Sequence, residues 1–167
     1  MTEKNVRPFV IGPGEGQTLR SPVGGDVTQL ALGDQSGGAL TAFEASAPPG
    51  QGPPLHVHIT EDEVISVLEG ELRVSLDGTV HEAAAGSFVF IPRGVAHTWQ
   101  AVGDQPARFV FMFTPAAPGM EQFFTRAAEL ADDAGVAEAF KSFAADAGMN
   151  VLGPPLAQSE GSVTDSK

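Results

Sequence analysis

The sequence contains no cysteine, few basic residues and no long apolar run. Without cysteine the chain has no disulfide, no thiol nucleophile and no thiolate metal ligand, which fits a reducing compartment. Nine Lys and Arg residues against 21 Asp and Glu residues give a formal net charge of -12. This charge argues against a nucleic-acid partner and against anionic membrane surfaces, because both require clustered basic side chains.

Membrane insertion and secretion are also disfavoured by the apolar pattern. No segment approaches about 18 consecutive apolar residues, the length that a membrane-spanning helix needs. Residues 1–8 lack the apolar stretch of a secretory signal. We therefore expect a soluble, cytoplasmic protein with no membrane partner.

Short runs of alternating or apolar residues, separated by turn-forming residues, predict an all-β fold. The 20 glycines and 13 prolines suit many short strands better than long helices. The clearest runs are residues 6–11, 18–22, 26–32, 40–47, 72–76, 97–101 and 108–114, and residues 86–91 predict a buried strand. Asp77-Gly78 predicts a tight hairpin, because glycine tolerates the positive φ of such a turn.

After residue 117 the apolar period becomes helical. Residues 118–131 and 136–147 predict two short amphipathic α-helices, and Gly148 suits the end of the second. We predict one domain, with a β-barrel over residues 1–117, a helical appendage over 118–148 and an extended tail over 149–167, mobile from about residue 157. Because the apolar helix faces need a partner, the helices either cap the barrel or pack against a second subunit.

The most informative pattern combines three of the four histidines with one glutamate: His56, His58, Glu63 and His97. In a strand, His56 and His58 share one face and Val57 lies on the other. The pair alone is equally compatible with two ordinary histidines. Glu63, however, would be an unpaired carboxylate inside an apolar barrel, and a cation removes that cost. We call these four residues the ligand cluster and predict one divalent transition metal ion per chain, with Ni, Co, Fe, Mn, Cu and Zn all compatible.

The fourth histidine, His81, is a different case. It follows the Asp77-Gly78 turn beside Glu82, in a polar stretch. We therefore predict a solvated side chain that takes no part in the metal site.

The residues around the ligand cluster resemble the two motifs of the cupin superfamily. Gly-X5-His-X-His-X4-Glu-X6-Gly matches from Gly50 to Gly70, and Gly-X5-Pro-X-Gly-X2-His matches from Gly86 to His97. The resemblance implies a single jelly-roll-like barrel, the double-stranded β-helix, with the metal ligands converging inside it. The family usually has an Asn where this chain has Ala101, which removes one polar group near the site.

Further phrases, including Pro-Pro-Leu-His-Val-His and Leu-Gly-Pro-Pro-Leu, resemble the bacterial quercetin 2,3-dioxygenase-like monocupins. This resemblance implies a metal-dependent ring-cleaving dioxygenase that uses dioxygen on a flavonol-like or other enolisable aromatic substrate. Glu63 would be both ligand and catalytic base. Two alternatives stay open. One is a metal-dependent isomerase, cyclase or lyase for a carbonyl or polyketide-like substrate, and the other is a non-catalytic cupin that binds a small ligand.

Strand parity also selects candidates for an apolar substrate pocket: Phe43, Ile65, Trp99 and Phe111, together with Phe88 or Phe90. For any one of them, ordinary core packing is the alternative. The expected partners are a small-molecule substrate, dioxygen and a second copy of the chain in a homodimer.

Overall fold

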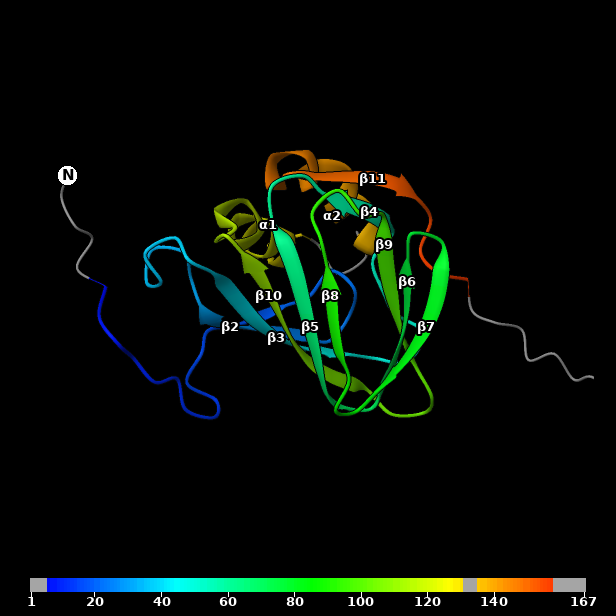
Figure 1. The fold of residues 1–167 in the computed structure, drawn as a ribbon, viewed down its shortest axis with the longest axis horizontal. Coiled ribbons are helices and arrows are strands. Elements are labelled where there is room, and N and C mark those ends of the chain that lie inside the picture. The colour runs from blue at the N-terminus through cyan, green and yellow to red at the C-terminus, as the bar shows by residue number, and fades with distance from the viewer. Residues whose placement is uncertain (1–5, 131–134, 158–167) are drawn as a thin grey trace, which may run out of the picture.

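Two antiparallel sheets face each other and form a barrel in the structure, a computed structural model in which residues 6–130 and 135–157 are described (Figure 1). One sheet has the order β1 (Thr18–Arg20), β2 (Asp26–Ala31), β3 (Thr41–Ala47), β10 (Ala107–Thr114), β5 (Asp62–Glu69) and β8 (Phe88–Ile91). The other has the order β11 (Met149–Gly153), β4 (Leu55–His58), β9 (His97–Val102), β6 (Glu71–Leu76) and β7 (Thr79–Ala84). The predicted all-β class with a single barrel is confirmed.

Strand β10 shows how the sequence produces an aromatic interior. Phe109, Phe111 and Phe113 are buried, whereas Val110 and Met112 between them are partly exposed. Because side chains alternate across a strand, the three rings share the inward face. Strand β10 lies between β3 and β5, so these rings stand in the middle of the first sheet.

The predicted hairpin at Asp77-Gly78 is confirmed and joins β6 to β7. Asp77 has a φ of 48° and Gly78 a φ of 84°, so both residues adopt the positive φ of a tight turn. His81 lies in β7 and is exposed, as its polar neighbours predict.

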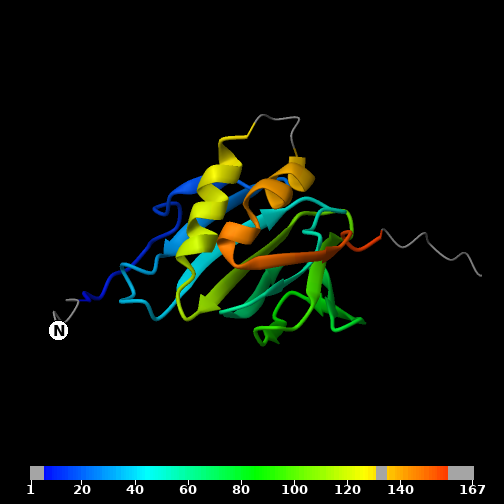
Figure 2. The same cartoon turned by 90° about the horizontal axis from the view of Figure 1, so that it is seen from above.

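Two helices cover one end of the barrel, α1 (Pro118–Ala128) and α2 (Gly135–Phe143), followed by a 3-10 helix (Ala145–Ala147) (Figures 1 and 2). The prediction of two C-terminal helices is confirmed, although both are shorter than predicted. Gly148, with a φ of 74°, ends the 3-10 helix.

A buried polar contact fixes α1 to the barrel. Glu121 Oε1 accepts hydrogen bonds from the Thr41 hydroxyl at 2.6 Å and from the Gly33 amide at 2.7 Å. Thr41 Oγ1 in turn accepts the amide hydrogen of Ala117, just before the helix. This contact holds the apolar face of α1 against the barrel, and that face consists of Met120, Phe123, Phe124 and Ala127.

The segment predicted as an extended tail begins with strand β11, which joins the second sheet. Strand β11 pairs with β4, so that Met149 lies opposite His58 and Val151 opposite His56. On its other side, β4 is in register with β9 at one pair, His56 and His97. The mobility predicted from about residue 157 falls, beyond that residue, outside the described part of the chain.

One strand prediction is wrong, and one strand is less buried than predicted. Residues 6–11 alternate like a strand but pair with no strand among the described residues and are largely exposed, because alternation does not supply a neighbouring edge. The strand predicted at 86–91 is present as β8, with Ile91 buried, but the prediction that it is buried is wrong for its outward face, where Phe88 and Phe90 are 68% and 53% exposed. An apolar run is buried only where both faces of the strand are covered.

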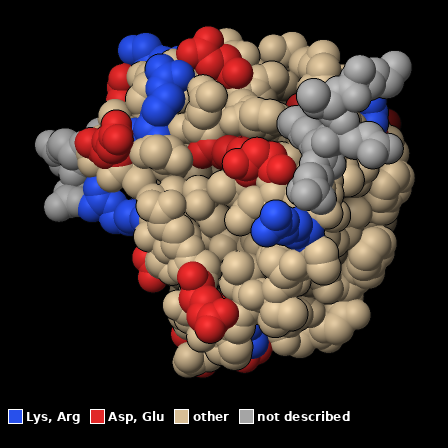
Figure 3. Space-filling view, turned by 90° about the vertical axis from the view of Figure 1, so that its left-hand side faces the viewer, with Lys and Arg blue, Asp and Glu red and all other residues tan. Residues whose placement is uncertain are grey.

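Basic side chains lie in separate small groups on the face in Figure 3, interrupted by acidic and uncharged ones. A nucleic-acid surface would instead present a continuous basic patch. In the described residues, no helix has the length and apolar character needed to span a membrane. The cytoplasmic location and the homodimer stay predictions.

Gly25, in the turn between β1 and β2, tests this packing. Its φ is 69°, and a Cβ atom there would lie 1.9 Å from the Ser46 carbonyl oxygen, whereas Gly78 has a φ of 84° and open space around it. We expect Gly25→Ala to lower the free energy of unfolding by about 3 kcal/mol and Gly78→Ala by about 1 kcal/mol, since only the first adds a clash to backbone strain. Urea unfolding measures both, and equal losses would contradict the close contact.

Candidate metal centre

The ligand cluster is assembled from three strands in both sheets. His56 and His58 lie in β4, and His97 lies in β9, directly opposite His56. Glu63 lies in β5, in the other sheet. Because side chains alternate along a strand, His56 and His58 point to the same side of β4. The cluster therefore spans the barrel interior from one sheet to the other.

The four side chains converge and are buried. Their candidate ligand atoms all lie within 4.8 Å of one another. Glu63 Oε2 is 2.9 Å from His97 Nε2 and 3.3 Å from His58 Nε2. Each of the four residues is at most 5% exposed. Three imidazole nitrogens and a carboxylate oxygen at this spacing suit a transition metal ion with positions left open for substrate.

Backbone carbonyls determine which nitrogen of two histidines carries hydrogen. His56 Nδ1 lies 2.8 Å from the Pro54 carbonyl oxygen, and His97 Nδ1 lies 2.9 Å from that of Val95. Because a carbonyl oxygen only accepts, each Nδ1 is the donor. In the neutral rings Nε2 then has a free lone pair, the form in which imidazole binds a metal.

The contact between His97 and Glu63 requires a cation. With hydrogen on Nδ1, a neutral His97 would present the Nε2 lone pair to Glu63 Oε2 at 2.9 Å, and two acceptors at that distance repel. A proton between the two atoms, carried by either the imidazole or the carboxyl group, or a metal ion shared by both, makes the contact attractive. The nitrogen and oxygen atoms of these residues therefore form a donor set that fits a metal ion.

His58 is oriented by packing. Its Nδ1 is buried and, within the described part of the chain, has no hydrogen-bond partner. The ring meets Phe113 edge-on, with centroids 5.0 Å apart. Of the three histidines, His58 thus receives its orientation from an aromatic neighbour and not from a carbonyl.

Burial and mutual electrostatics set the protonation states of the cluster. Burial, followed by the nearby His97 and His58, lowers the pKa of His56 to about 3, so this ring is neutral at neutral pH. Burial acts to raise the pKa of Glu63, but hydrogen bonds with His58 and His97 outweigh it and the pKa falls below its usual value. Burial acts to lower the pKa of His97, but the hydrogen bond with Glu63 prevails and raises it.

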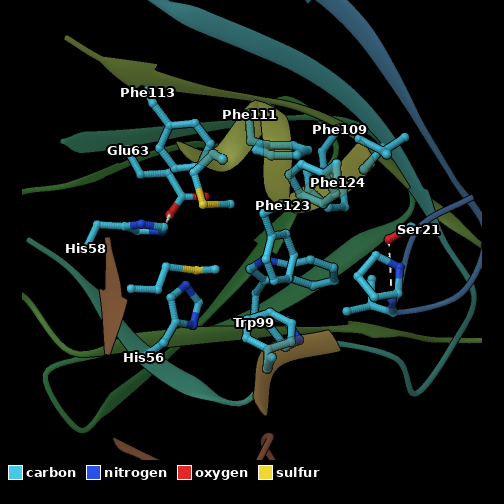
Figure 4. A pocket seen from close by; sticks show the side chains of 18 residues that line it. Ser21, His56, His58, Glu63, Trp99, Phe109, Phe111, Phe113, Phe123 and Phe124 are labelled. Carbon is cyan, nitrogen blue, oxygen red and sulfur yellow. Dashed lines mark hydrogen bonds and ion pairs between the residues drawn. The ribbon is translucent and has the colours of Figure 1, made fainter. Parts of the chain in front are cut away.

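The cluster adjoins a small, largely apolar cavity of about 50 Å³ that is partly open to solvent (Figure 4). His56, His58 and Glu63 line one side of it, and aromatic and thioether side chains form most of the remaining wall. These side chains are Trp99, Phe109, Phe111, Phe113, Met120, Phe123, Phe124, Phe140 and Met149. A site of this kind binds a largely apolar ligand and orients it through a few polar groups.

The predicted pocket residues divide into two groups. Trp99 and Phe111 line the cavity, whereas Phe43 and Ile65 are fully buried and do not. Phe43 stacks on Phe111 with ring centroids 5.2 Å apart and so supports the wall. Phe88 and Phe90 are exposed on β8. Parity separates inward from outward side chains but not a cavity wall from the core behind it.

Sequence reasoning missed the contribution of the helices and of β11 to the cavity. Met120, Phe123 and Phe124 of α1 and Phe140 of α2 line it, as does Met149 of β11. The amphipathic pattern of the helices was the available signal, because it required some apolar partner. Of the two alternatives for the helices, capping of the barrel is the arrangement within this chain.

Ala101, the departure from the second cupin motif, is fully buried in β9. Its amide donates to the Gln51 carbonyl and its carbonyl accepts from the Gly50 amide. The methyl side chain adds no polar group to the site, so the polar chemistry near the cavity depends on the ligand cluster and a few other side chains.

Comparison with known proteins establishes the family. Residues 43–113 match the cupin domain family. The chain is 34% identical over 132 residues to "Polyketide synthase CurC" of Streptomyces cyaneus, which covers 77% of this chain and 84% of that protein. The chain therefore belongs to the cupin family.

Two further likenesses are narrower. The chain is 34% identical over 98 residues to quercetin 2,3-dioxygenase of Bacillus subtilis (strain 168), covering 58% of this chain and 28% of that protein. The structure of KdgF from Halomonas sp. superimposes with a TM-score of 0.61 at 18% identity, over 68% of this chain and 99% of that one. At this identity the second likeness shows the fold alone.

Metal affinity should depend on pH through His97. Because its pKa is raised above 6.5, an incoming ion must displace a proton, and this competition disappears as the pH rises through that pKa. His56 holds no proton to displace. We expect the Kd for Ni²⁺ to decrease between about pH 6 and pH 8, with release of about one proton per ion at the lower pH. Calorimetry in two buffers of different ionisation enthalpy measures both quantities.

The exposed His81 supplies the control for this titration. His81→Gln should bind Ni²⁺ with unchanged affinity and proton release, because the residue lies outside the cluster. An affinity that does not vary with pH, without proton release, would show that His97 carries no extra proton before the ion binds, contrary to its raised pKa.

Proposed function

We propose that this cupin is a metal-dependent dioxygenase of the quercetinase type, acting on a flavonol-like or other enolisable aromatic substrate. The observation that carries the proposal is the position of a buried His3Glu cluster beside a partly open aromatic cavity. The aromatic lining of the cavity suits contact with a flat apolar molecule, and the cluster suits its adjacent hydroxyl and carbonyl oxygens. The likeness to the Bacillus subtilis dioxygenase supports this reaction class.

The residues of the cluster divide the work. A divalent ion held by His56, His58, Glu63 and His97 would supply Lewis acidity towards the enolisable oxygens of the substrate. Glu63 Oε2 is the acceptor for the hydroxyl proton of the substrate, because it is the ionised group at the centre of the cluster. Once the proton has moved to Glu63, His56, His58 and His97 would continue to hold the ion through their imidazole nitrogens.

The aromatic wall would position the substrate, and the two helices that cap the barrel would exclude water. Trp99, Phe111 and Phe123 provide flat surfaces along the cavity. Phe140 of α2 stands near His56, with ring centroids 6.1 Å apart. A dry surrounding strengthens the electrostatic interactions of the cluster and protects reactive enolates from side reactions.

A second candidate function has its own support. CurC, the relative that aligns over 84% of its length, is named a polyketide synthase protein. Cyclisation of a polyketide-like chain also begins with removal of a proton beside a carbonyl group, which the same Glu63 and metal site would serve. The two reactions differ in what consumes the enolate: dioxygen in the first, and a carbonyl carbon of the same molecule in the second.

Oxygen uptake separates these functions. The purified chain is loaded in turn with Ni²⁺, Co²⁺, Fe²⁺ and Mn²⁺, and is then given quercetin in air. We expect consumption of one dioxygen and release of one carbon monoxide per flavonol. A fully loaded protein that consumes no dioxygen with any enolisable substrate overturns the proposal. Metal-dependent conversion under strict anaerobiosis supports cyclisation, and saturable binding without turnover supports a ligand-binding cupin.

Glu63 can be tested against a matched carboxylate. Glu61 is also buried, at 9% exposure against 5% for Glu63, but does not belong to the cluster. We expect Glu63→Gln to lower kcat, corrected for metal content, by about 100-fold or more, because the proton acceptor is lost. Glu61→Gln should stay within about threefold. If Glu63→Gln kept both turnover and metal content, Glu63 would be neither base nor ligand.

A further inference from the structure

The cavity has a second polar side, formed by Ser21. This residue lies at the start of the turn between β1 and β2 and is 8% exposed. In Figure 4 it lies on the side of the cavity opposite His56, His58 and Glu63. The residues between these two sides are mainly phenylalanines together with Trp99. The cavity is therefore an apolar space with polar groups on two opposite sides.

The hydroxyl of Ser21 retains an unused hydrogen. Its Oγ accepts the amide hydrogen of Val23 at 3.3 Å. Among the described residues, the Ser21 hydroxyl accepts this hydrogen bond and donates none. Apart from Ser21 and the three cluster residues, the lining side chains are hydrocarbon, thioether or indole groups. The free donor therefore faces a space in which only a bound molecule or water can accept it.

The backbone holds Ser21 in a defined place. Its amide donates to the Gly25 carbonyl at 3.0 Å, and its carbonyl accepts the Gly24 amide at 3.1 Å. The preceding Arg20 donates to the carbonyl of Leu130, beyond the end of α1, at 2.9 Å. The turn is thus tied to the helical cap, and the donor is positioned before a ligand arrives, which lowers the entropy cost of binding.

We propose that Ser21 is a specificity-determining residue that donates a hydrogen bond to an oxygen at the end of the substrate remote from the metal centre. This inference rests on the proposed function, because it takes the cavity as the substrate site. It names the substrate class more closely: a flat, elongated aromatic compound with oxygen substituents at both ends. A substrate with no oxygen at that end would leave the buried Ser21 hydroxyl without a hydrogen-bond acceptor. Such a substrate would therefore bind more weakly than one that carries the oxygen.

Trp99 allows a test that does not require turnover. It is the single tryptophan of the chain and it lines the cavity, so its fluorescence reports occupancy. Two probes share the 3-hydroxyl and 4-carbonyl groups: quercetin, which carries hydroxyl groups on its outer rings, and 3-hydroxyflavone, which has none there. Both are titrated anaerobically into the Ni²⁺-loaded chain, and Kd is measured for each.

We expect Ser21→Ala to raise the Kd of quercetin by about 5- to 20-fold and to leave that of 3-hydroxyflavone within about twofold, the size of one lost hydrogen bond. Ser21→Thr keeps the hydroxyl and should restore most of the quercetin affinity. Ser75→Ala is the matched control, because Ser75 is also buried, at 7% exposure, but does not line the cavity. It should change neither Kd.

Three results overturn the inference: equal weakening of both flavonols by Ser21→Ala, no effect on quercetin, or no quenching of Trp99 by either probe. Equal weakening would show that the serine acts only through the shape of the turn. The proposed function fails separately. Quercetin that binds in a Ser21-dependent way without being converted in air supports Ser21 and rejects the dioxygenase. Conversion that does not depend on Ser21 does the reverse.

Discussion

Glu63 places a carboxylate between two imidazoles in the interior of an aromatic barrel, and the remaining features of the site depend on this contact. A buried charge without a partner is strongly unfavourable, and a proton or a metal ion bound there removes that cost. The carbonyl oxygen of Val95 accepts a hydrogen bond from Nδ1 of His97, so that Nε2 faces the carboxylate of Glu63. A proton or a metal ion can satisfy that pair, and the two compete for the same place.

The barrel meets this constraint by dividing the ligands between its sheets. The three histidines come from β4 and β9, and the carboxylate comes from β5 in the facing sheet. The same β5 pairs with β10, whose alternating phenylalanines form one wall of the cavity. The helical cap completes the cavity above these strands, anchored through Glu121 and Thr41. The metal ligands and the apolar wall therefore lie on neighbouring strands, and the helical cap covers the same strands.

How far the sequence predicts this arrangement depends on the range of the interaction. The ligand cluster, the Asp77-Gly78 hairpin and the two helices follow from local spacing, because parity, turn chemistry and helical period are local properties. The unpaired segment 6–11 and the exposed face of β8 do not, because a strand is defined by neighbours that its own residues cannot specify. For the same reason, parity predicts that both Phe43 and Phe111 point inward but not that only Phe111 lines the cavity.

Strand β11 has a consequence for the order in which the site is completed during synthesis. The His56-Val57-His58 strand is four residues long and is aligned with β9 at a single pair, whereas β11 aligns with it along most of its length. Its main support thus comes from residues about ninety positions later in the chain, although all four ligands have by then been translated. A nascent chain that carries every ligand but not yet β11 leaves one edge of its histidine strand open. The metal centre therefore reaches its complete strand environment only after residues 149–153 have been synthesised.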